Sequence, residues 1–137
     1  MLLMSIKTKY ANEIFSGKKK YEFRRKSIGD KNCNKKIYIY SSENEKAIVG
    51  YMVVDRILKG DLDYILNETN YFDNKDIVDY FIGSKECFAL HINNYYRFKN
   101  PIELDEIRSV DNKFVIPQFY RYISEKEPLC GLLRFRE

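Results

Sequence analysis

The sequence predicts a mainly β protein of the α+β class. Five to seven strands would form a small closed or nearly closed barrel, with an N-terminal helix and a helical insert. Strand-like runs follow one another mostly without helical crossovers, which favours a barrel over a doubly wound sheet. The 137 residues are 45% hydrophobic, so we expect one core and a single domain over residues 1–137. Aromatic residues make up 15% of the chain, and all are tyrosine or phenylalanine, which favour strands.

The first half of the chain predicts one helix and four strands. The strands are expected at residues 2–7, 19–25, 37–40 and 47–58. Thr8 is placed to cap a helix after the first strand, and Gly17 is placed to end that helix. The third strand is apolar on both faces, which indicates a central position in the sheet. Gly50 interrupts the fourth strand, as a bulge does where a barrel bends.

Helical spacing returns in the middle of the chain and predicts an insert at residues 61–83. Two helices are expected there, at residues 61–67 and 74–81. Asp61 and Asn74 are suitable N-caps, and Gly83 closes the insert.

The last third of the chain predicts mostly extended structure. In order, we expect a strand or strand pair interrupted near Asn93, an extended exit and a last strand, at residues 86–98, 101–104 and 129–135. Between the exit and the last strand, Pro117 is placed to start a short helix.

The charge is distributed unevenly. Residues 1–40 contain 11 lysines and arginines against three acidic residues, a net of +8, whereas residues 41–137 contain 13 against 17, a net of −4. This asymmetry predicts a basic surface for an anionic partner, nucleic acid first. The alternative is a lysine-rich composition that reflects an AT-rich genome.

The sequence gives no support for a zinc site, a disulfide framework, a cofactor site, a signal peptide or a membrane span. The three cysteines show no zinc or disulfide spacing, and Cys87 and Cys130 are expected in the core. His91 is the only histidine, so we expect a structural role for it before that of a triad base. With no metal-ligand spacing and no glycine-rich phosphate loop, we expect neither a metal nor a cofactor. No apolar run reaches membrane-spanning length, and the N-terminus is too short for a signal peptide. We therefore expect a soluble cytoplasmic protein with no membrane contact.

The strongest candidate site is the basic stretch at residues 16–26. Arg24 has a permanent charge and a planar fork suited to phosphate or a base edge, and Glu22 can hold neighbouring cations in place. Lys19 can neutralise a phosphate or transfer a proton. In a regular strand, however, Lys19 would lie on the face opposite Glu22 and Arg24, so it joins them only if the strand begins irregularly after Gly17. The alternative is a solvated stripe of salt bridges.

A second group of candidates lies at residues 115–122. Gln118 is suited to a base edge, Arg121 to a phosphate, and Tyr120 or Tyr122 to base stacking. The alternative is that these aromatic residues cap an open end of the barrel. Lys7, at the exit of the first strand, would add a positive charge.

These stretches resemble the ASCH domain family of the PUA-like superfamily. The residues Gly17-x-Lys19-x-x-Glu22-x-Arg24 match the family motif, residues 5–11 resemble its opening, and residues 96–102 with 115–122 resemble its later segments. The resemblance implies a PUA-like β-barrel with a cleft on the motif that binds RNA or a nucleotide. Some members are N4-acetylcytidine amidohydrolases, and others are proposed ribonucleases. In the amidohydrolases the motif lysine, matched by Lys19, is catalytic, but Glu22 stands where their nucleophilic threonine would be.

We therefore predict RNA or nucleotide binding in a basic cleft, in RNA processing or regulation. The predicted binding residues are Lys7, Lys19, Glu22, Arg24, Gln118, Tyr120 and Arg121. The first alternative is a hydrolase of RNA or of a modified nucleoside, in which Lys19 stabilises charge and Glu22 is the general base or positions water. The second is a regulatory module that senses a small ligand or docks a protein. The sequence leaves turnover, the protein partner and the role of the insert open.

Overall fold

The computed structural model describes residues 1–72 and 74–136. Over these residues six strands form one curled sheet, a half-barrel, in the order β2-β5-β4-β3-β1-β6. The strands are β1 (Leu2–Lys7), β2 (Tyr21–Arg24), β3 (Lys36–Ser42), β4 (Ala47–Gly60), β5 (Cys87–Glu103) and β6 (Tyr120–Tyr122). β1 and β3 are parallel and the other pairs are antiparallel, and β2 and β6 lie at opposite edges. The predicted fold class is thus confirmed, as a half-barrel, and β3 has the central position expected of it.

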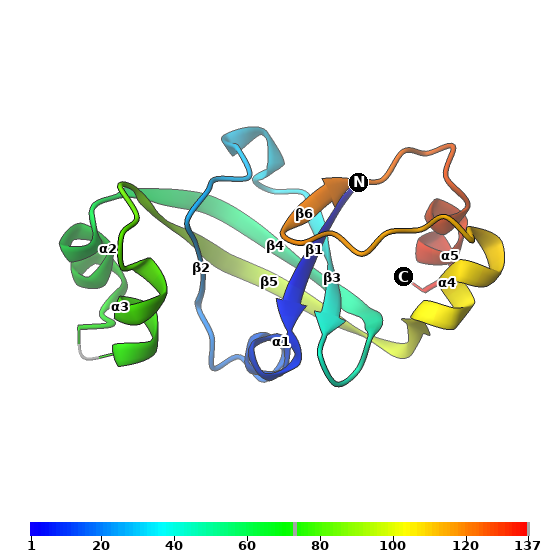
Figure 1. Cartoon of the computed structure of the whole chain (residues 1–137), viewed down its shortest axis with the longest axis horizontal. Coiled ribbons are helices and arrows are strands. Elements are labelled where there is room, and N and C mark those ends of the chain that lie inside the picture. Colours follow the sequence, from blue (N-terminus) through cyan, green and yellow to red (C-terminus); the bar gives the residue numbers. More distant parts are fainter. Residues whose placement is uncertain (73, 137) are drawn as a thin grey trace.

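The helices cover the two faces and the two ends of this sheet. They are α1 (Thr8–Phe15), the short 3₁₀ helix η1 (Asp30–Asn32), α2 (Leu62–Thr69), α3 (Lys75–Phe81), α4 (Leu104–Val110) and α5 (Pro128–Arg136). The long β4–β5 ribbon runs through the molecule, with α2 and α3 at one end and α4 and α5 at the other (Figure 1). No helix within the two described ranges is long and apolar enough to cross a membrane.

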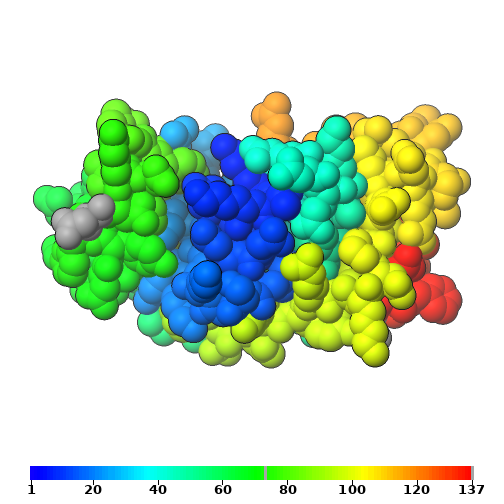
Figure 2. All heavy atoms as spheres, turned by 90° about the horizontal axis from the view of Figure 1, so that it is seen from below, coloured from blue at the N-terminus to red at the C-terminus, as the bar shows by residue number. Residues whose placement is uncertain are grey.

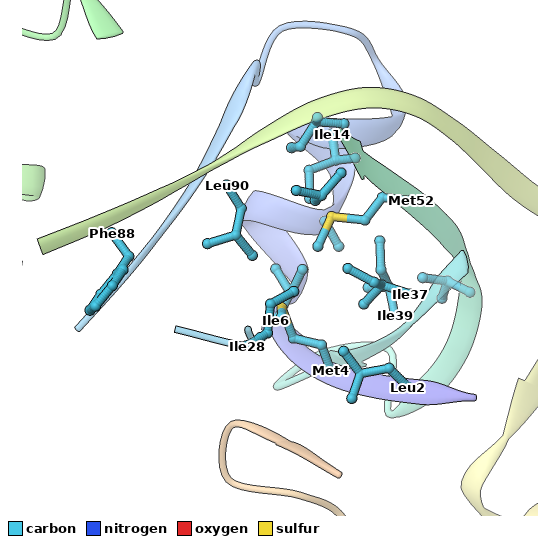
Figure 3. Close-up of a cluster of buried hydrophobic side chains, with 14 of the residues drawn as sticks. Leu2, Met4, Ile6, Ile14, Ile28, Ile37, Ile39, Met52, Phe88 and Leu90 are labelled. Carbon is cyan, nitrogen blue, oxygen red and sulfur yellow. The ribbon is translucent and has the colours of Figure 1, made fainter. Parts of the chain in front are cut away.

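The main core lies between α1 and the sheet. Figure 3 shows apolar side chains of β1, β3, β4 and β5 packed around Ile14 of α1. Two further clusters complete the core. One joins β1, β3 and β5 to α4 and α5, and the other joins β2 and β5 to α2 and α3. Cys130 lies buried at α5 and Cys87 in the third cluster, as expected.

The β4–β5 ribbon bends at irregular positions. The pairing register shifts between Ile48 and Gly50 and again on either side of Val54. At Gly50 a side chain has no room, because its Cβ would collide with the backbone carbonyl of Tyr96 on β5. The predicted bulge is therefore confirmed, and the close approach of two backbones explains the glycine.

Local signals account for most helix ends. Asp61 caps α2 by accepting from the backbone N–H of Tyr64, and Asn74 caps α3 in the same way. Gly17 follows α1 with φ +79°, which favours glycine. The expected cap at Thr8 is wrong, because Thr8 is already inside the helix. Its hydroxyl donates to the Ser42 carbonyl and so ties α1 to the end of β3.

The C-terminal third differs from the prediction. The expected strand at residues 129–135 is the helix α5, whose buried residues Leu129, Cys130 and Leu133 lie on one helical face. No helix begins at Pro117, and the strand β6 follows instead and pairs with β1. The expected exit at residues 101–104 is the end of β5 and the start of α4, a helix that the sequence analysis missed. β5 itself is continuous through Asn93.

Candidate functional site

A cleft of about 630 Å³ lies between the N-terminal segment and the helical insert. Its lining comes from β1, α1 and β2 and from Tyr71 and residues 74–80 of the insert, and Gln118 also contributes. Figure 2 shows these two parts of the chain, in blue and green, next to each other on one face of the molecule. The insert is therefore a wall of the cleft.

Glu22 is the centre of an ion-pair cluster in this cleft. Its side chain is 6% exposed and meets the ammonium of Lys19 at 3.0 Å through Oε1 and the guanidinium of Arg24 at 2.7 Å through Oε2. Arg24 donates a second bond to Oε2 through Nε, at 2.8 Å, and another to the backbone carbonyl of Ser5, at 2.9 Å. With such low exposure the cluster is a built site, which argues against a solvated stripe.

The local backbone explains how Lys19 reaches Glu22. β2 begins only at Tyr21, so Lys19 precedes the strand, and its backbone N–H donates to the carbonyl of Glu13. This irregular start after Gly17 frees the lysine from the alternation of the strand. Glu22 and Arg24, two residues apart within β2, share a face as the strand period requires. The expected second strand is thus two residues shorter at its start, and the three side chains meet.

One oxygen of the cluster lacks a hydrogen bond. Glu22 Oε1 is buried and has no hydrogen-bond partner among the described residues. The ammonium of Lys19 lies within ion-pair distance of this oxygen but outside hydrogen-bond angles. This oxygen is therefore held by its ion pair with Lys19 and is closed to ligands by its burial.

Aromatic rings surround the charged cluster. The Lys19 ammonium lies 4.5 Å from the centre of the Tyr10 ring, and the Arg24 guanidinium lies 4.7 Å from that of Phe119. Phe23 meets Tyr71 of the insert edge to face, with ring centres 5.1 Å apart.

A second contact fixes the insert against β2. Arg25 donates to the backbone carbonyl of Tyr80 at 2.8 Å and lies 4.5 Å from the centre of its ring. α3 is thereby held to the end of β2, and its Tyr80 lines the cleft.

The cleft lining is mixed in charge rather than basic. The acidic side chains that line it are Glu13, Glu22, Asp76 and Asp79, and the cationic ones are Lys7, Lys9, Lys19 and Arg24. Lys19 and Arg24 are paired with Glu22, and Lys7 makes a long, exposed ion pair of 3.8 Å with Glu43. The cleft thus carries four cationic and four acidic side chains, and most lysines and arginines of residues 1–40 lie outside its lining.

The structure brings together five of the seven predicted binding residues. Lys7, Lys19, Glu22, Arg24 and Gln118 all line the cleft. Tyr120 and Arg121 lie outside the lining. Tyr120 packs against Phe119 and Tyr122, and Arg121 pairs with Glu127 at 2.9 Å and lies over Phe114.

The sequence analysis missed the insert's contribution to the cleft, which is made by Tyr71, Asp76, Ile77, Asp79 and Tyr80. The helical spacing of the last four, at i and i+3, was a signal for one shared face.

His91 belongs to a separate pair outside the lining. Its Nδ1 lies 2.6 Å from an oxygen of Asp55, and the hydrogen bond from His91 lowers the pKa of the Asp55 carboxyl below its ordinary value. Tyr21 packs against the imidazole, with ring centres 5.1 Å apart. Within residues 1–72 and 74–136, no group of three or more His, Cys, Asp or Glu side chains could hold a metal ion.

The curled half-barrel and its cleft define a PUA-like domain. The N-terminal domain of Staphylothermus marinus McrB has a similar fold, with a TM-score of 0.62, 15% identity and coverage of 99% of this chain and 93% of that one. The model of the ASCH domain matches residues 4–87, and the chain belongs to the ASCH domain family.

Two matches in Zymomonas mobilis come from this family. The crystal structure of ASCH from that organism has a TM-score of 0.86 at 24% identity, over 99% of this chain and 95% of that one. A Zymomonas mobilis protein named "ASCH domain-containing ribonuclease" is 26% identical over 128 residues, which are 91% of this chain and 85% of the relative.

Proposed function

We propose that this protein binds RNA in the cleft between its N-terminal segment and its helical insert. The observation that supports this function best is the buried Lys19–Glu22–Arg24 cluster at the base of a cleft with aromatic walls. RNA recognition commonly combines cations for phosphate with aromatic rings for unstacked bases. The ribonuclease named among the relatives adds support, because its substrate class is RNA.

Each part of the cleft has a role in this proposal. Lys7 and Lys9, at the exposed side, meet the phosphate, while Tyr10 and Tyr71 offer ring faces or edges to a base. Glu22 holds Lys19 and Arg24 in fixed positions beside the ligand. Gln118 offers both a donor and an acceptor.

Fluorescence anisotropy with a labelled single-stranded RNA of mixed sequence tests the proposal. Lys19→Ala should weaken binding at least tenfold, because it removes a cation and loosens Glu22. Lys18→Ala is the matched control, since Lys18 is an exposed lysine next in sequence that does not line the cleft. Lys9→Ala removes an exposed cleft cation without disturbing the buried cluster. Equal affinities for the wild type and all three variants would mean that RNA binds outside the cleft. No binding by any of the proteins would mean that the proposal is wrong.

A second candidate function is RNA cleavage, which the name of the Zymomonas mobilis relative favours. Glu22 would accept the proton of the attacking hydroxyl, and Lys19 would stabilise the negative charge that develops on the phosphate. The P–O bond to the leaving ribose oxygen would then break, and that oxygen would take a proton from water. Turnover of labelled RNA in a chelator-treated sample, reduced in Glu22→Gln by far more than RNA binding at a temperature where thermal melting shows the variant folded, would support cleavage. If the wild type leaves RNA intact under conditions where it binds, this candidate is wrong.

A further inference from the structure

The helical insert adds negative charge to a cleft that is also lined by cations. Asp76 and Asp79, one helical turn apart on α3, both line the cleft and are exposed. No described cation forms an ion pair with either of them. A phosphate group that entered from the side of Lys7 and Lys9 would therefore face two free carboxylates across the cleft.

We propose that α3 acts as an electrostatic filter that admits one nucleotide unit of an RNA chain and excludes the phosphates of the neighbouring units. The inference rests on the proposed function, because it concerns how RNA would occupy the same cleft. One phosphate can sit near Lys7 and Lys9, while its sugar and base extend towards α3. A second or third phosphate would lie against Asp76 and Asp79 and be repelled.

Three further observations are consistent with a cleft that holds a single nucleotide. The volume of about 630 Å³ falls in the range of sites that enclose one small molecule. Tyr71 and Tyr80 lie on the same wall as the two aspartates and provide rings beside them for one base. The third observation is the buried Lys19–Glu22–Arg24 cluster, whose ion pairs hold the charged groups of β2 in one arrangement beside that space.

The carboxylates of Asp76 and Asp79 can form hydrogen bonds with the sugar and base of a nucleotide, which are uncharged. Ribose hydroxyls and the amino or imino groups of a base donate hydrogen bonds, and carboxylates only accept them. Asp76 and Asp79 are therefore acceptors for one sugar and one base, either at the end of an RNA chain or turned out of it.

Contacts with β2 and the loop after it fix the position of α3 beside the cleft. Arg25 of the loop after β2 holds the backbone and ring of Tyr80, and Phe23 of β2 contacts both Tyr71 and Phe81. α3 is thus attached to the strand that contributes Glu22 and Arg24. A filter needs this attachment, because a free helix would swing away from a strand of RNA.

The test compares long and short ligands with the double variant Asp76→Asn, Asp79→Asn. The probes are a labelled 12-nucleotide oligouridylate and the four nucleoside 5′-monophosphates, each measured across a salt series. The matched control is Asp63→Asn, Glu68→Gln, which removes the same charge from exposed positions on α2 that do not line the cleft. Thermal melting of each variant checks that the fold is retained.

We expect the cleft variant to bind the 12-mer roughly three- to tenfold more tightly than the wild type, with a steeper salt dependence, as more phosphates gain access. The control should bind like the wild type. The monophosphates, which carry a single phosphate group, should gain less affinity in the cleft variant than the 12-mer does. Equal 12-mer affinity and salt slope in the cleft variant and the control would overturn the filter. Failure of the proposed function looks different, because Lys19→Ala would then leave the binding of every probe unchanged.

Discussion

Replacing Glu22 by glutamine should destabilise the fold by about 3 kcal/mol. The substitution keeps the shape of the side chain but removes its charge, and Lys19 and Arg24 are then left with no anionic partner. The side chains of these two cations are only 11% and 16% exposed, so water cannot replace the lost carboxylate fully. Breaking a buried ion pair at one partner typically costs about 3–5 kcal/mol, and the remaining exposure places this cluster near the lower limit.

Urea denaturation measures this loss as a shift of the midpoint at constant slope. The control is Glu43→Gln, which removes the exposed partner of Lys7, whose side chain is 65% exposed. That surface pair should contribute less than about 1 kcal/mol. If Glu22→Gln costs no more than Glu43→Gln, the cluster is a solvated stripe after all, and the account of a built site is wrong.

Three further predictions concern the ribbon and the insert. Gly50→Ala should cost at least about 3 kcal/mol in urea denaturation, because its Cβ would strike the backbone of β5; a loss below 1 kcal/mol would mean that the ribbon shifts freely. The depressed pKa of Asp55, caused by the His91 hydrogen bond, adds stability above its unfolded pKa of about 4 that is lost as pH falls through the folded value. Asp55→Asn should therefore flatten the stability profile between about pH 5 and 3, and an unchanged profile would refute this linkage. Arg25→Ala should speed hydrogen exchange in α3 by about tenfold, through loss of the Tyr80 contacts, while exchange in β4 stays constant; uniform change in both would contradict it.

Local patterns in the first half of the chain were strong enough to predict its structure. β1, β3, β4 and the bulge at Gly50 follow from apolar runs and one glycine. The period of two in β2 placed Glu22 and Arg24 together, and Gly17 hinted at the irregular start that brings in Lys19. In this region, short-range chemistry and tertiary structure agree.

The C-terminal segment could not be assigned in this way. Residues 129–135 contain an apolar run that is compatible with a buried strand or with a helix, and periodicity over so few residues does not separate the two. In the structure the segment is a helix, because Leu129, Cys130 and Leu133 then lie on one face and complete the core beside α4. Tyr120 and Arg121 were candidates by residue type alone, and their partners Phe119 and Glu127 become visible only in three dimensions.

The contribution of the helical insert to the cleft could not be predicted from the sequence for a similar reason. Arg25 and Tyr80 are 55 residues apart in sequence, so no local pattern indicates that the insert folds back onto β2. Once it does so, Asp76 and Asp79 change the predicted basic cleft into one of mixed charge. The composition of residues 1–40 indicated the cations of the cleft, but it could not indicate the two aspartates of the insert that also line it.

The central claim is that the cleft on the Lys19–Glu22–Arg24 cluster binds RNA. The most direct test is the anisotropy titration of single-stranded RNA with the wild type, Lys19→Ala and Lys18→Ala, at two salt concentrations. The account predicts that Lys19→Ala loses at least tenfold in affinity, while Lys18→Ala loses no more than about twofold at either concentration. Equal losses in both variants, or no binding by the wild type, would contradict the claim and leave the cleft as a site for another ligand.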